Sequence, residues 1–224
     1  MVTSTKNLSD CSAEEKRFAA RVVRALTTDY PNASCSLRFD SPLQLLVATI
    51  LSAQCTDERV NLVTEQLFAD YPTAADLAAV PIKKLEQAVR STGFFRNKAK
   101  NIKACCQTLV EEYDGQVPRT MEELVPLPGV GRKTANVVLG NAYGIASGVV
   151  VDTHVTRICG RLGLVATKDA VKIERKLNEL LPRKEWIDFS HRCIQHGRRV
   201  CVARTSPHCN DCRMRKFCPQ IGVD

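Results

Sequence analysis

The sequence lacks a hydrophobic run long enough to cross a membrane. Its longest apolar stretch, residues 42–53, is shorter than the ~20 residues of a transmembrane helix and contains Gln44. The first eleven residues are polar, without the apolar centre of a secretory signal or the arginine-rich pattern of a transit peptide. We therefore expect a cytoplasmic protein that makes no contact with a membrane.

Alternation of polar and apolar residues, the pattern typical of β-strands, is almost absent, and residues 148–151 are the only candidate strand. Apolar residues instead recur at helical spacing in about ten short segments, several of which follow a Ser, Thr or Asp that could cap a helix. The expected helices follow Ser12, Ser41, Thr56, Thr73 and Thr120 and cover residues 81–91, 96–113, 132–142, 153–162, 169–181 and 186–200. The sequence predicts an all-α fold, in which the helix after Ser41, apolar on nearly every side, is the central one.

Positive charge is in excess. The chain has 32 Lys and Arg against 24 Asp and Glu, a net charge of +8, and nine of the basic residues lie between Arg183 and Lys216. A basic surface favours polyanionic partners such as nucleic acid or an anionic membrane. On charge alone, a solvated face with no partner would be the better explanation.

Four of the eleven cysteines are clustered near the C-terminus, in the pattern Cys201-x7-Cys209-x2-Cys212-x5-Cys218. The other seven are scattered, and we expect most of them to be small buried residues. Clustered cysteines without a secretory signal indicate metal binding. A single C-x-x-C fits a four-iron four-sulfur cluster better than a zinc ribbon, which normally has two such pairs, although zinc stays possible.

Residues 127–135, Leu-Pro-Gly-Val-Gly-Arg-Lys-Thr-Ala, lie between two expected helices and have the form of a helix, a glycine hairpin and a second helix. We expect Gly129 and Gly131 to form a tight turn with positive φ, which leaves backbone N–H groups free to bind a phosphate. Arg132 follows them. The same residues could form a purely structural turn, but the adjacent Arg-Lys favours nucleic-acid binding.

Lys133 and Asp152 are the candidate catalytic pair. Lys133 lies in the first turn of the helix after the hairpin, where the helix dipole and Arg132 should lower its pKa and make it a nucleophile. The simpler interpretation is a lysine that neutralises phosphate. Asp152, in Val151-Asp-Thr-His154, is placed to cap the next helix, and the same carboxylate could stabilise positive charge on a sugar and move protons.

The hairpin, the Val-Asp-Thr-His-Val motif and the four cysteines occur in an order and spacing that resembles the endonuclease III family of DNA glycosylases. The likeness runs from about Ser41 to Cys218. It implies a six-helix barrel domain with a helix-hairpin-helix motif at residues 35–146. It also implies an iron-sulfur cluster domain, built from residues 1–34 and 147–224, with the substrate between the two.

The resemblance also implies a reaction, partners and a cofactor. A monomer would bind double-stranded DNA containing damaged pyrimidines or abasic sites, at the bacterial nucleoid. Lys133 would form a Schiff base, Asp152 would be the catalytic aspartate, and Cys201, Cys209, Cys212 and Cys218 would hold a 4Fe-4S cluster. The expected DNA contacts are Gln54 in the gap left by a flipped base, Phe94 as a wedge, and Gly129, Gly131, Arg132, His154 and Arg204.

Two features depart from the family pattern, because the first cysteine spacing is one residue longer than usual and Phe94 stands where a leucine is expected. Two other functions remain open. A monofunctional mismatch glycosylase would share the hairpin, aspartate and cluster, but it normally lacks the lysine found at position 133. A non-catalytic DNA-binding module would use the cluster for structure or redox sensing.

Overall fold

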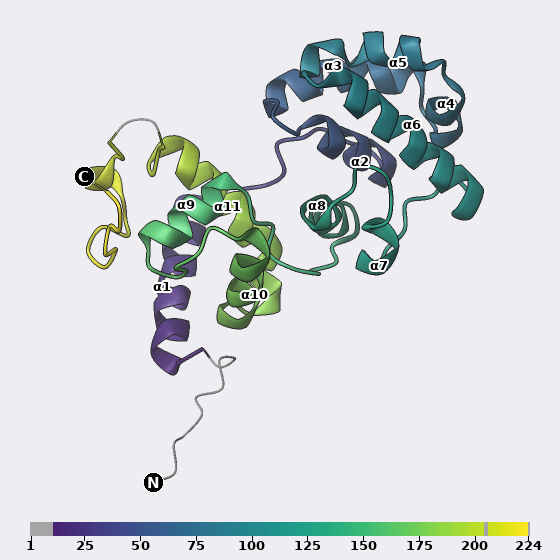
Figure 1. The fold of residues 1–224 in the computed structure, drawn as a ribbon. Helices are drawn as coiled ribbons and strands as arrows, with labels where there is room; N and C mark the ends of the chain where they lie inside the picture. Colours follow the sequence, from purple (N-terminus) through teal and green to yellow (C-terminus); the bar gives the residue numbers. More distant parts are fainter. Residues whose placement is uncertain (1–10, 204–205, 224) are drawn as a thin grey trace. The chain divides into compact units, whose positions relative to one another are not determined.

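The computed structural model describes residues 11–203 and 206–223, which form eleven α-helices and three short 3-10 helices, with no β-strand among them (Figure 1). The all-α prediction is confirmed. Residues 148–151, the candidate strand, connect two helices instead, and the Val149 N–H donates to the Asn178 side chain at 3.0 Å. The Val149 N–H is therefore paired with a side chain and not with a neighbouring strand.

The chain divides into two compact units. Unit 1 comprises Met1–Ser34 and Gly148–Asp224, and unit 2 comprises Cys35–Ser147. Unit 1 contains α1 (Ala13–Asp29), α9 (Thr153–Arg161), α10 (Ala170–Leu180), η2 (Arg183–Glu185), α11 (Trp186–Arg199) and η3 (Cys209–Asp211). Unit 2 contains α2 (Pro42–Leu51), α3 (Asp57–Asp70), α4 (Ala74–Ala79), α5 (Ile82–Ala88), η1 (Arg90–Thr92), α6 (Phe95–Glu112), α7 (Met121–Leu124) and α8 (Arg132–Tyr143).

Helix α2 is the centre of unit 2, as its composition predicts. The Ser41 hydroxyl caps it by accepting from the Gln44 N–H, and Pro42 occupies the first helical position. Every residue from Leu45 to Leu51 is buried, and α2 contacts α3, α6 and α8. Burial of each leucine contributes about 1.5–3 kcal/mol, so this helix anchors the elements that surround it.

Unit 1 brings the two ends of the described chain into one hydrophobic core. Helix α1 contacts α10 and α11, and α9 contacts α11. Leu26 from the first part of the chain is buried with Ile158 and Phe189 from the second. The α1 N-terminus has the expected capping box, and Glu15 of that box also pairs with Lys176 of α10 at 2.7 Å.

Helices α9 and α11 approach closely at Gly197. A Cβ atom there would lie 2.5 Å from the His154 Nδ1 atom and 2.8 Å from the Arg157 Nη2 atom. Glycine is therefore needed for the packing of these two helices. Arg157 uses the space by donating to the Gly197 carbonyl at 3.0 Å.

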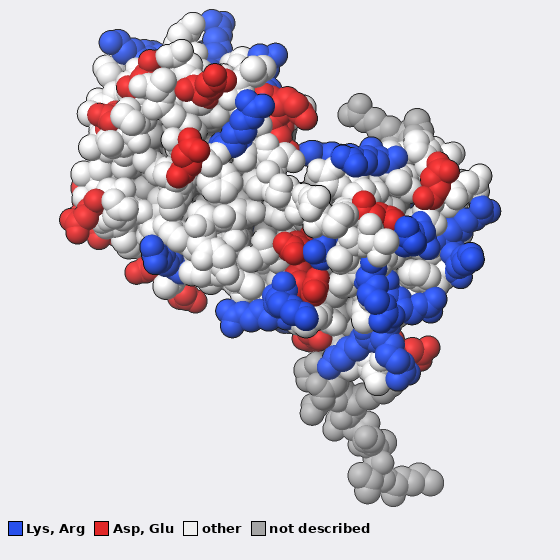
Figure 2. Space-filling view, turned by 180° about the vertical axis from the view of Figure 1, so that it is seen from behind, with Lys and Arg blue, Asp and Glu red and all other residues white. Residues whose placement is uncertain are grey.

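The charge of the chain is divided unequally between the units. By sequence, unit 1 has twenty Lys and Arg against twelve Asp and Glu, a net charge of +8, whereas unit 2 has twelve of each and is neutral. Figure 2 shows Lys and Arg side chains gathered on the face of unit 1 that is in view. Among the described helices, none is both long enough and apolar enough to span a membrane.

Candidate functional site

The glycine hairpin lies between α7 and α8 in unit 2. Gly129 has φ +78°, as predicted, and a Cβ there would also lie 2.8 Å from the Asn101 Cβ atom of α6. Gly131 differs from the prediction because its φ is −97°, in the extended region open to any residue. It is the N-cap of α8, and no atom lies within 4 Å of the position that its Cβ would take. The fold therefore requires glycine at 129 but not at 131.

The N-terminus of α8 has the properties of an anion site. Gly131 is the N-cap residue and has no side chain that could accept a hydrogen bond from the N–H groups in the first turn of the helix. Such N–H groups and the helix dipole favour a bound phosphate. Gly131, Arg132 and Lys133 are all exposed at this end of the helix. Lys133 is thus accessible to a large ligand.

Gln54 and Phe94 stand on two other turns of unit 2. Both are exposed, Phe94 by 65%, and both have left-handed backbone conformations, with φ values of 53° and 47°. A non-glycine residue in this conformation stores roughly 1–3 kcal/mol of strain, and such residues concentrate at functional sites. An exposed phenylalanine on a strained turn is placed to contact a partner rather than the core.

Asp152 begins α9 in unit 1. Its Oδ1 atom accepts from the Val155 N–H at 2.8 Å, which confirms the predicted N-cap. The carboxylate is half-buried. His154, the second residue of the helix, is also half-buried, and its Nδ1 atom lies 3.2 Å from the Arg157 Nη2 atom. The helix therefore presents an oriented carboxylate at its N-terminus.

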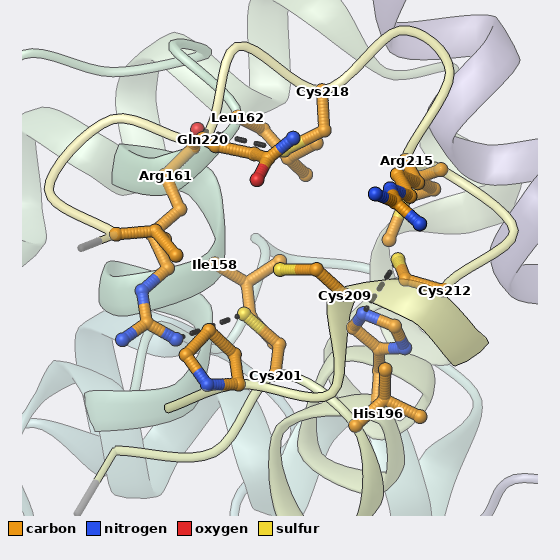
Figure 3. Close-up of a pocket in the computed structure, with 14 residues that line it drawn as sticks. Ile158, Arg161, Leu162, His196, Cys201, Cys209, Cys212, Arg215, Cys218 and Gln220 are labelled. Carbon is orange, nitrogen blue, oxygen red and sulfur yellow. Dashed lines mark hydrogen bonds between the residues drawn. The ribbon is translucent and has the colours of Figure 1, made fainter. Parts of the chain in front are cut away.

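The four clustered cysteines line one cavity at the other end of α9 (Figure 3). Burial raises the pKa of the Cys212 and Cys218 thiols, and the neighbouring thiols of the group raise it further. The cavity has a volume of about 30 Å³, at least twice the roughly 10–15 Å³ that one water molecule needs. Among the described residues, no three His, Cys, Asp or Glu side chains form a site for a single metal ion. Arg204 lies outside the described residues.

Hydrogen-bond donors surround these thiols. Arg161 donates to the Cys201 Sγ atom at 3.1 Å and to the Val202 carbonyl at 2.8 Å. The His196 Nε2 atom lies 3.7 Å from the Cys212 Sγ atom, and its Nδ1 atom lies 3.1 Å from the Tyr30 hydroxyl. Burial lowers the His196 pKa to about 4, so the ring is neutral at neutral pH. The cavity thus offers sulfur ligands and a polar outer layer.

Sequence reasoning missed the role of the α9 arginines. Arg157 donates to the carbonyls of Gly197 and Cys201, and Arg161 binds the same cysteine segment. Their spacing of four residues places them on one face of the helix, which is a weak signal. Their partners lie about forty residues away, so only the fold shows that α9 connects Asp152 to the cysteine cavity.

Comparison with known proteins gives consistent matches over most of the chain. Residues 47–183 match the HhH-GPD superfamily of base excision DNA repair proteins. Endonuclease III from Synechocystis sp. is 55% identical, covering 92% of this chain and 94% of the relative. Endonuclease III from Bacillus subtilis is 46% identical, covering 84% and 86%.

Solved structures agree with these matches. A trapped covalent endonuclease III–DNA intermediate has a TM-score of 0.87 and 43% identity, and the match covers 92% of this chain and 96% of that one. A thermostable thymine-DNA glycosylase, with a TM-score of 0.82 at 22% identity and coverage of 90% and 95%, shares the fold. This chain therefore belongs to the endonuclease III family, within the HhH-GPD superfamily of base excision DNA repair proteins.

Proposed function

We propose that this protein removes oxidised pyrimidines from double-stranded DNA as a bifunctional glycosylase that also cleaves the strand at the abasic site. The observation that carries the proposal is its 43% identity, over 92% of the chain, to an endonuclease III solved as a covalent DNA intermediate. A covalent intermediate requires a nucleophile on the enzyme. The exposed Lys133 at the N-terminus of α8 is our candidate.

The reaction follows from an amine nucleophile. The uncharged Lys133 Nζ atom attacks C1′ of the damaged nucleotide, the bond from C1′ to the base breaks, and the base leaves with a proton. The sugar ring opens to give a Schiff base. Loss of a C2′ proton then expels the 3′ phosphate, which nicks the strand, and water releases the lysine. Asp152 stabilises positive charge on the sugar and carries protons, as its oriented position at the α9 N-terminus allows.

The remaining candidate residues serve DNA binding. Gly129, Gly131 and Arg132 hold a phosphate at the α8 N-terminus, and this contact is independent of sequence. Gln54 fills the gap left by the flipped base, while Phe94 inserts as a wedge beside it. Because extruding a base costs a few kcal/mol, such insertion stabilises the flipped state. His154 contacts phosphate, and Arg204, between Cys201 and Cys209 in the sequence, serves the same purpose.

The cysteine cavity is the proposed site of a four-iron four-sulfur cluster. The four thiols line one cavity, and four cysteines with a single C-x-x-C fit such a cluster better than a zinc ribbon, which normally has two such pairs. Cys201, Cys209, Cys212 and Cys218 would hold it, and it would stiffen a segment with few apolar residues. We further propose that the protein acts as a monomer at the bacterial nucleoid.

Borohydride trapping tests the nucleophile. The enzyme is incubated with duplex DNA containing an oxidised pyrimidine, borohydride reduces any Schiff base, and the covalent adduct is measured on a denaturing gel. We expect an adduct with the wild type and none with Lys133→Gln. Lys84→Gln, which removes an exposed lysine of α5 in the same unit, should trap normally.

Each other outcome assigns a different function. Release of free base without an adduct would identify a monofunctional glycosylase that uses water. DNA binding with neither product would indicate a non-catalytic module. An adduct that persists in Lys133→Gln would mean that another amine is the nucleophile.

A further inference from the structure

Lys98, in the first turn of α6, is a buried lysine that the proposed chemistry does not use. Its side chain belongs to a residue that is only 4% exposed, which is unusual because lysines are almost never fully buried without a partner. Its Nζ atom donates to the Thr92 carbonyl oxygen at 2.7 Å. Burial lowers its pKa. The ammonium is therefore satisfied by a backbone carbonyl of the turn that precedes α6.

That turn carries Phe94. Gly93 has φ +72° and Phe94 has φ +47°, so two consecutive residues adopt left-handed conformations and the second has a bulky side chain. The Lys98 backbone N–H donates to the Phe94 carbonyl at 3.1 Å, while its side chain binds the Thr92 carbonyl. One residue thus holds the carbonyl groups on both sides of Gly93. Strained conformations persist only where surrounding contacts enforce them, and these two bonds do so.

The need to fill space in the core does not explain why residue 98 is a lysine. A methionine has nearly the same length and would avoid the cost of removing a charge from water. What a methionine lacks is the donor that holds the Thr92 carbonyl. We propose that Lys98 is a positioning residue that keeps the Phe94 turn in the shape required for insertion into DNA, a proposal that rests on the wedge role of Phe94 in the proposed function.

The test compares a reaction that needs insertion with one that does not. Base release from duplex DNA containing an oxidised pyrimidine, measured under single-turnover conditions, requires extrusion of the base. Borohydride trapping on a single-stranded abasic oligonucleotide does not. We expect Lys98→Met to slow duplex base release about 10–100-fold, the effect of losing one charge-assisted hydrogen bond, and to change single-strand trapping less than about twofold.

Lys103→Met is the matched control. Lys103 also lies in α6, is half-buried, and donates from Nζ to two backbone carbonyls, those of Ala78 and Val80, at 2.5 and 2.8 Å. The first carbonyl belongs to the last turn of α4 and the second to the connection that follows it. We expect this variant to lose thermal stability while its ratio of duplex to single-strand activity stays at the wild-type value.

A double-mutant cycle shows whether Lys98 acts through the turn. Phe94→Gly removes both the wedge and the strain, because glycine adopts positive φ freely. In that background, adding Lys98→Met should cost little further activity. If Lys98→Met does not fold, Lys98→Gln is used instead, because glutamine keeps a hydrogen-bond donor on a shorter side chain. We expect Lys98→Gln to slow base release from duplex DNA by less, and to leave single-strand trapping unchanged.

Three outcomes would overturn the proposal. Lys98→Met could reduce activity equally on both substrates, or it could leave duplex base release unchanged. It could also reduce duplex base release as much in the Phe94→Gly background as it does in the wild type. Failure of the proposed function is distinguishable from these results. In that case the wild-type enzyme itself releases no base and forms no adduct.

Discussion

Asp152 has two roles that substitution can separate. Its carboxylate caps α9 and is also the proposed partner of the nucleophile. Because asparagine caps helices as well as aspartate, Asp152→Asn should keep the melting temperature of the wild type while losing about 10²–10⁴-fold in single-turnover base release. Asp152→Ala should lose the same activity and, in addition, about 1 kcal/mol of stability.

Thermal melting and base release on the same samples check this prediction. Full activity in Asp152→Asn would leave the residue with its capping role alone. A lower melting temperature for Asp152→Asn than for Asp152→Ala would contradict the capping argument.

Lysine has three different roles in this protein, as Lys133, Lys98 and Lys103 show. Lys133 is exposed at a helix N-terminus, Lys98 is buried beneath a strained turn, and Lys103 joins α6 to the C-terminal end of α4. Only the first of these was identifiable from the sequence, because the hairpin motif next to it is local. The burial of the other two depends on contacts with residues elsewhere in the fold.

At the scale of elements, the two hairpin glycines are required for different reasons. Gly129→Ala should destabilise unit 2 by roughly 1–2 kcal/mol for its left-handed backbone, and more for the overlap with Asn101. Gly131→Ala should cost no more than about 1 kcal/mol, the difference between alanine and glycine at an N-cap, since its φ suits any residue and its Cβ would meet no atom beyond its chain neighbours. Yet it should weaken DNA binding about tenfold, because the added methyl group would occupy the space in front of the α8 N–H groups.

Urea denaturation and DNA binding, measured on both variants, separate the two effects. Normal DNA affinity of Gly131→Ala would rule out the α8 N-terminus as a phosphate site. If Gly129→Ala were as stable as the wild type, the hairpin turn would have to move away from Asn101 of α6 to make room for the new Cβ atom.

Helix ends were predictable because capping is local. The hydroxyls of Ser12, Ser41, Thr56 and Thr73 each accept from an N–H three residues ahead, so the signal lies within one helical turn. The prediction of a positive φ at Gly131 failed because a glycine pattern does not report why glycine is present. Glycine occurs both in turns that need a positive φ and at positions where a ligand must come close to the backbone.

For the whole molecule, we expect the cofactor to belong to unit 1 alone. All four clustered cysteines lie in unit 1, whereas the buried core of unit 2, from Leu37 to Leu139, comes entirely from residues 35–147. The full chain should therefore contain about four iron and four sulfide per molecule. A fragment of residues 35–147 should fold without either and show helical circular dichroism with a cooperative thermal transition.

The same fragment tests the division of charge. It is neutral by composition, so its binding to DNA should be weak and should depend little on salt, whereas binding by the full chain should fall steeply as salt rises. Stoichiometric zinc in the full chain would contradict the cluster. A fragment without helical structure would show that unit 2 depends on unit 1.

Local sequence patterns were sufficient to predict the helices, the excess of positive charge near the C-terminus, the cysteine cluster and the resemblance to endonuclease III. Each of these depends on residue types at short spacing. Only the packing of the chain shows that four thiols share one cavity, that α9 joins this cavity to Asp152, and that Lys98 is buried beneath the Phe94 turn. Burial and contact depend on which distant segments pack together, and spacing along the chain does not record this.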